Sequence, residues 1–126
     1  MARILAFSAV VELATGLVLL ADPALVVSLL LGVDASAAVT WVGRCFGVAL
    51  LALGVACWPS HSRSASDSAV LRAPLIYNAG IALYLAYLGA AAHVGGPLLW
   101  PAVALHAGVA VALLFPNALS KRARSD

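Results

Sequence analysis

Charged residues are scarce in this chain of 126 residues: they make up 10% of it, while hydrophobic residues make up 64%. A soluble domain carries about 25% charged and about 45–50% apolar residues. The net charge is only +2, and neither a basic stripe nor a nucleic-acid-binding motif is present, which excludes nucleic acid as a partner. The composition predicts a protein whose main partner is a lipid bilayer.

Cysteine is also scarce, since only Cys45 and Cys57 are present, and neither belongs to a Cys-x-x-Cys or Cys/His metal-binding pattern. They lie 12 residues apart in one apolar segment. On one helix that separation is about 18 Å, which excludes a disulfide between them. We interpret both as small buried hydrophobic residues. We predict no metal site and no cofactor, and leave a quinone or a haem as open alternatives.

Four apolar segments have lengths that suit a bilayer, which a helix crosses with about 20 residues. They cover residues 4–21, 38–58, 73–92 and 98–115. The first is not a secretory signal, because Glu12 falls within the apolar core that such a signal needs. The sequence therefore predicts an all-α fold, an integral membrane four-helix transmembrane bundle that forms a single domain over residues 1–126.

A short apolar segment, residues 24–31, separates the first two spans. Asp22 and Pro23 precede it as a good N-cap and a good first helical residue, and Gly32 follows it as a helix stop. The segment is too short to cross a bilayer. We expect an interfacial or re-entrant helix. The alternative is a continuation of the first helix, with Pro23 in its interior.

Positive charge is distributed unevenly around the four spans. Lys and Arg occur near the N-terminus, in the polar loop 59–72 and in the basic tail 117–126, and none occurs in residues 22–37 or 93–97. Cytoplasmic segments carry the excess of Lys and Arg in membrane proteins. Both termini and the polar loop are therefore expected in the cytoplasm.

Each long span carries a polar residue away from its ends: Glu12, Arg44, Asn78 and His106. An Arg inside a span is costly unless it meets a partner, so we predict an ion pair between Arg44 and Glu12. With a rise of about 1.5 Å per residue, these two and His106 are expected in one central cluster. Asn78 or a tyrosine such as Tyr84 is expected beneath it.

Two interpretations of this cluster stay open. In one, the pair of Glu12 and Arg44 is structural and fixes the register of the helices. In the other, the cluster is functional and forms a proton path or holds a polar headgroup such as a quinone.

Small residues recur at spacings that let helices approach closely. In the second span Gly43 and Gly47 form a GxxxG pair that Gly54 continues, and in the fourth span Ala104 and Gly108 form a row. We expect both sets to pack against helices. A homo-oligomer or other membrane subunits are the expected protein partners.

Residues 12–54 contain two motifs, GLVLLADPALVVSLLLG over 16–32 and RCFGVALLALG over 44–54. On these motifs the chain resembles the DoxX-like group of small bacterial four-helix membrane proteins. The resemblance implies four spans in the bacterial cytoplasmic (inner) membrane. It also implies redox or quinone-linked partners, since some DoxX-type proteins are subunits of thiosulfate:quinone oxidoreduction or thiol-stress complexes.

The sequence favours a non-enzymatic subunit or accessory protein of a membrane complex, with a redox or quinone-linked complex implied by the resemblance. One alternative is an oligomeric proton-coupled small-molecule transporter with Glu12 as proton carrier. It would be oligomeric because one chain of four short helices encloses little volume. Another is a membrane enzyme acting on a lipid-soluble substrate, with Glu12 and His106 as acid and base.

Overall fold

The computed structural model describes residues 2–58 and 68–115. In these two ranges the regular structure is entirely helical. Its helices are α1 (Ala2–Ala21), α2 (Pro23–Leu31), α3 (Ala37–Cys57), α4 (Ser68–Ala90) and α5 (Leu99–Leu114). Residues 59–67 of the expected polar loop, and the basic tail 117–126, lie outside the described residues.

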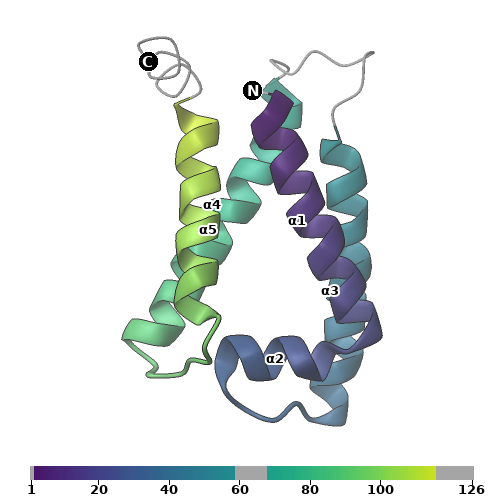
Figure 1. Ribbon diagram of the computed structural model, residues 1–126, viewed down its shortest axis with the longest axis vertical. Coiled ribbons are helices and arrows are strands. Elements are labelled where there is room, and N and C mark those ends of the chain that lie inside the picture. Colours follow the sequence, from purple (N-terminus) through teal and green to yellow (C-terminus); the bar gives the residue numbers. More distant parts are fainter. Residues whose placement is uncertain (1, 59–67, 116–126) are drawn as a thin grey trace.

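Helices α1, α3 and α4 are each long and apolar enough to cross a membrane, and α5 is a shorter apolar helix of 16 residues. These four helices run alternately in opposite directions, so that the start of α1 and the end of α5 lie at the same end of the molecule (Figure 1). Helix α2 lies across the opposite end (Figure 1). The described residues are therefore all-helical, and three of their helices suit a membrane.

Helices α1, α3, α4 and α5 form two pairs. α1 packs mainly on α3, and α4 packs mainly on α5, while α1 with α5 and α3 with α4 make fewer contacts. We call α1 and α3 the first pair and α4 and α5 the second pair. The two pairs approach each other less closely than the helices within either pair.

Helix α2 is separate from α1, so the alternative of one continuous helix is wrong. Asp22 has φ −143° and ψ 82°, outside the helical region, and its carboxylate accepts a hydrogen bond from the N–H of Leu25 at 3.1 Å. Pro23 opens the new helix, where its missing N–H removes no hydrogen bond. Gly32, at φ 70°, ends α2 in the left-handed conformation that glycine adopts without strain.

Helix α4 begins earlier than the sequence predicts. It starts at Ser68 rather than near residue 73, so the last part of the expected polar loop is helical and Pro74 lies inside the helix. The side chain of Asn78 donates a hydrogen bond to the Pro74 carbonyl at 2.8 Å. This contact fixes an amide side chain on the buried face of α4.

Glycines set the distance between α1 and α3. A Cβ on Gly47 would lie 2.8 Å from the carbonyl oxygen of Gly16, and a Cβ on Gly16 would lie 2.9 Å from the carbonyl oxygen of Gly47. Gly54 also lies against α1, and Gly43 lies against Pro23 at the start of α2. The glycines predicted for packing in the second span therefore face α1 and the start of α2.

Ala104 and Gly108 lie on the outward side of α5, so the packing expected of this row stays a prediction about another subunit. Both residues are exposed, and a Cβ on Gly108 would meet no atom within 4 Å. The reason is the rotation of α5, which turns Val109 and Leu113 toward Leu5 of α1. The small-residue row lies on the opposite, outward side of the helix.

Candidate functional site

A polar network joins α1, α4 and α5 in the interior of the molecule. Ser8 and Glu12 lie one helical turn apart on α1, and the Ser8 hydroxyl is 2.8 Å from Oε1 of Glu12. Nδ2 of Asn78 lies 3.3 Å from the Ser8 hydroxyl, and Oδ1 of Asn78 lies 2.7 Å from Nδ1 of His106. The structure thus brings Glu12, Asn78 and His106 together, and it connects them through Ser8.

The amide of Asn78 fixes the proton positions in this network. Its Nδ2 faces the Pro74 carbonyl, which only accepts hydrogen bonds, so Nδ2 is the donor and Oδ1 is the acceptor. Nδ1 of His106 must therefore carry the hydrogen that it donates to Oδ1. In a neutral His106, Nε2 then carries the lone pair.

The hydrogen bonds of the network all run in one direction. His106 donates to Asn78, Asn78 donates to Ser8, and the Ser8 hydroxyl donates to Glu12 when the carboxyl is ionised. Hydrogen bonds in such a chain polarise and strengthen one another. Asn78 does not relay a proton as a hydroxyl or carboxyl does, so the network positions Glu12 and His106 without forming a proton wire between them.

Tyr77 completes the site beside His106. The two rings meet edge to face, with centroids 5.7 Å apart and an interplanar angle of 84°. This is a favourable geometry for aromatic pairs. Tyr77 therefore restrains the orientation of the imidazole ring from a position next to Asn78 on α4.

One carboxyl oxygen of Glu12 lacks a hydrogen-bond partner in this site. Its side chain is 2% exposed, and Oε2 has less than 1 Å² of accessible surface and no hydrogen-bond partner among the described residues. Buried polar atoms are hydrogen-bonded in most native structures, and an unpaired buried charge is costly. The carboxyl is therefore incompletely satisfied by the protein side chains around it.

Arg44 does not meet Glu12, which corrects the predicted ion pair. Its side chain is exposed, and its Nε donates to the carbonyl oxygen of Leu20 at 3.3 Å. The reason is the register of α1 and α3: Gly16 lies opposite Gly47, so Arg44 lies beside the end of α1, and Glu12 lies on the other side of this crossing. Leu20 is also among the last residues of α1, whose carbonyls lack helical partners and attract a cation.

Tyr84 also lies outside the network, with 60% of its side chain exposed. It is seven residues beyond Tyr77 on α4, or about 10 Å farther along the helix, away from the level of Asn78. The predicted cluster does not include Ser8 and Tyr77, although Ser8 shares a helix face with Glu12 and Tyr77 adjoins Asn78 in the sequence. The spacing of Ser8 from Glu12, one helical turn, is the signal that points to it.

No group of three or more His, Cys, Asp or Glu side chains that could hold a metal ion occurs in residues 2–58 and 68–115. No family model, curated protein or solved structure was found to match the chain. The resemblance to the DoxX-like group therefore stays a prediction from the motifs of the first half. The candidate site is defined by its own geometry.

Proposed function

We propose that this chain is a multi-pass protein of the bacterial cytoplasmic membrane that acts, as an oligomer, in proton-coupled transport of a small molecule, with Glu12 as the proton carrier. The observation that carries this proposal is the buried, unpartnered Oε2 of Glu12. An ionisable residue inside a membrane span is costly, and its usual roles are in proton relays and ion pathways.

Four crossings with both termini in the cytoplasm are consistent with the arrangement of the helices. The start of α1 and the end of α5 lie at one end of the molecule (Figure 1), and Arg3 in the first turn of α1 and Arg72 near the start of α4 lie toward that end. Helix α5 has 16 residues, which is about 24 Å of helix and somewhat less than the hydrocarbon thickness of about 30 Å. Helix α2, across the other end, suits an interfacial position.

A proton is the ligand that fits Glu12. Because Oε2 has less than 1 Å² of accessible surface, a water molecule or a metal ion has no room beside it. A proton needs no such room and removes the charge. The Ser8 hydroxyl serves both states, because Oε1 accepts its hydrogen bond when the carboxyl is ionised and also when Oε2 carries the proton.

The position of Glu12 links its proton to the arrangement of the helices. The network crosses from Ser8 on the first pair to Asn78 on the second pair, and the contacts between the pairs are fewer than those within them. In the structure the protein covers Oε2, and we call this arrangement the closed form. A proton enters or leaves Oε2 only when the contact between the first and second pairs opens. Proton exchange and helix movement are then the same event, as coupled transport requires.

Infrared spectroscopy of the protein in lipid tests the proton site directly. Ordinary Asp and Glu side chains ionise with pKa values of about 4, so at pH 7 they give no carbonyl stretch of a protonated carboxyl. We expect the wild type to keep such a band at pH 7 and Glu12→Gln to lack it. A wild-type protein without the band at pH 7 would contradict Glu12 as a proton carrier in the closed form.

Transport is tested with proteoliposomes on a solid-supported membrane, with a panel of amines, amino acids and sugars added in turn. The expected result is a charge-displacement current for at least one compound class that Glu12→Gln abolishes. Tyr84→Phe is the matched control, because Tyr84 lies outside the network. Currents of equal size in the Glu12→Gln protein would contradict the proposed role of the carboxyl.

A second candidate function is a non-enzymatic subunit or accessory protein of a membrane complex, for which the outward row of Ala104 and Gly108 provides support. Small residues let a helix of another subunit approach closely, and Gly108 has no neighbour within 4 Å of its added Cβ. Purification in mild detergent followed by mass spectrometry tests this function. A stable partner lost in Gly108→Leu supports it, and the same partner content in wild type and variant contradicts it.

A further inference from the structure

The guanidinium of Arg44 uses its Nε in a hydrogen bond and has further N–H groups that could bind a ligand. Its Nε donates to the carbonyl oxygen of Leu20, and no ion pair with an Asp or Glu of the described residues holds its other nitrogens. A guanidinium has five N–H donors in a planar fork, which matches the oxygens of a phosphate or carboxylate. Four donors of Arg44 are thus available at the surface of α3.

The guanidinium lies near the membrane interface at the α2 end of the molecule. Leu20 is the second-to-last residue of α1, and α2 crosses the molecule just beyond it (Figure 1). Trp41, one turn before Arg44 on α3, is 66% exposed. Exposed Trp side chains gather at the level of lipid headgroups. Arg44 is therefore placed where its side chain reaches headgroup phosphates.

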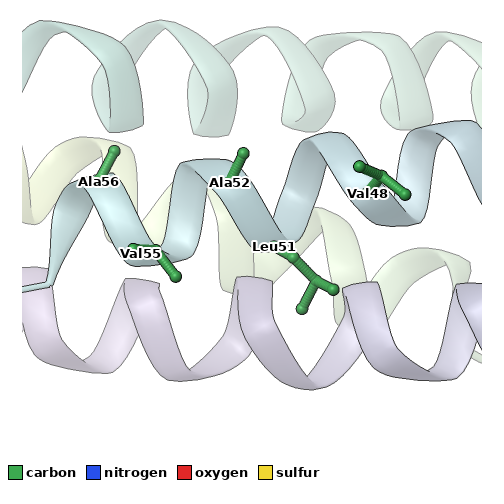
Figure 2. Close-up of a pocket in the computed structure, with 5 residues that line it drawn as sticks. All are labelled: Val48, Leu51, Ala52, Val55 and Ala56. Carbon is green, nitrogen blue, oxygen red and sulfur yellow. The ribbon is translucent and has the colours of Figure 1, made fainter.

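A shallow apolar groove begins one turn farther along α3. It has a volume of about 670 Å³ and is lined by Val48, Leu51, Ala52, Val55 and Ala56 (Figure 2). Figure 2 shows two rows on this face of α3, with Leu51 and Val55 at the edge nearer α1 and Val48, Ala52 and Ala56 at the other edge. Between these side chains the surface is hydrocarbon only.

Arg44 and the groove share one face of α3. Residues three, four and seven positions apart lie on the same side of a helix, and Trp41, Arg44, Val48, Leu51 and Val55 follow that spacing. From Val48 to Ala56 the groove extends over about 12 Å of helix, most of the thickness of about 15 Å of one leaflet's hydrocarbon. A cation above an apolar groove of this length has the layout of a phospholipid: charge at the interface and chain below it.

We propose that this face of α3 binds an anionic phospholipid from the leaflet at the α2 end, with its phosphate on Arg44 and one acyl chain along the groove. The charge of Arg44 selects the anionic headgroup, and the groove supplies an apolar surface that a free anion does not need. The site is independent of Glu12, so it stands apart from the transport proposal.

Native mass spectrometry of the detergent-solubilised protein tests the site with dioleoyl phosphatidylglycerol as the probe. Arg44→Gln removes the charge, and Ala52→Trp fills the groove at an exposed position about two turns away from Arg44. Arg72→Gln is the matched control, because Arg72 is an exposed arginine on α4. Far-UV circular dichroism checks that every variant keeps its helix content.

We expect each of Arg44→Gln and Ala52→Trp to reduce the lipid-bound fraction at equal lipid concentration by at least fivefold, and Arg72→Gln to leave it unchanged. Equal binding in wild type and Arg44→Gln would overturn the proposal. Loss in Arg44→Gln with full binding in Ala52→Trp would also overturn it, because the groove would then be unused. Displacement of the lipid by millimolar inorganic phosphate would identify a site for free anions and overturn the lipid assignment.

Discussion

The crossing of α1 over α3 gives a quantitative prediction, because two glycines with opposite surroundings can be changed in the same way. In Gly47→Ala the new Cβ would lie 2.8 Å from the carbonyl oxygen of Gly16, a backbone atom that cannot rotate away. In Gly108→Ala the new Cβ would meet no atom within 4 Å. Both changes replace glycine by alanine inside a helix.

The common part of the two changes cancels in the comparison. Replacing glycine by alanine in a helix interior stabilises the helix by about 0.5–1 kcal/mol. Forcing an extra methyl group into a packed interface costs about 1–3 kcal/mol. We therefore expect Gly47→Ala to be less stable than Gly108→Ala by about 1–3 kcal/mol, and toward the upper part of this range because the obstructing atom belongs to the backbone.

The free energy of unfolding can be measured by titrating the micelle-solubilised protein with sodium dodecyl sulfate and following helix content by circular dichroism. Gly80→Ala serves as a second control, because a Cβ there also meets no atom within 4 Å. Equal stability of Gly47→Ala and Gly108→Ala would refute the close approach of α1 and α3 at Gly16. A loss in all three variants would indicate that the outward faces of α4 and α5 are also packed.

Three further changes test the network and the helix break. Glu12→Gln should retain or raise the thermal midpoint of unfolding, since the amide keeps the contact with Ser8 and removes a buried acid; a clear drop in scanning calorimetry would contradict an uncompensated carboxyl. Asn78→Leu should lower the free energy of unfolding by about 1–3 kcal/mol, because Nδ1 of His106 loses its acceptor, whereas Tyr84→Phe should be neutral in the same detergent titration. Gly32→Ala should cost about 1–2 kcal/mol, because Gly32 has φ 70°; a thermal midpoint equal to wild type would exclude that conformation at the end of α2.

The spans and their breaks follow from local sequence. Apolar length predicts the long helices to within a few residues, and Asp22, Pro23 and Gly32 separate α2 from its neighbours in the structure as their capping preferences predict. The start of α4 is missed, because residues 68–72 are polar enough to resemble a loop and are helical all the same. Hydropathy reports on burial in lipid and does not detect the polar first turns of a helix.

The polar residues show the limit of reasoning from spacing. The sequence identifies Glu12, Asn78 and His106 as interior polar residues of different helices, and the structure joins them through Ser8. It also suggests Arg44 as the partner of Glu12, since opposite charges in lipid are expected to meet. The structure instead places Arg44 beside a free carbonyl at the end of α1.

The sequence by itself determined which segments are helical, which of them suit a membrane and which side chains are too polar for lipid, because these properties depend on residues close together in the chain. Only the tertiary structure decided which polar side chains meet and which small residues face outward. Those outcomes depend on the rotation and axial register of one helix against another. The contact of Gly16 with Gly47 sets that register for α1 and α3, and it leaves Arg44 beside the end of α1 and Glu12 in the interior.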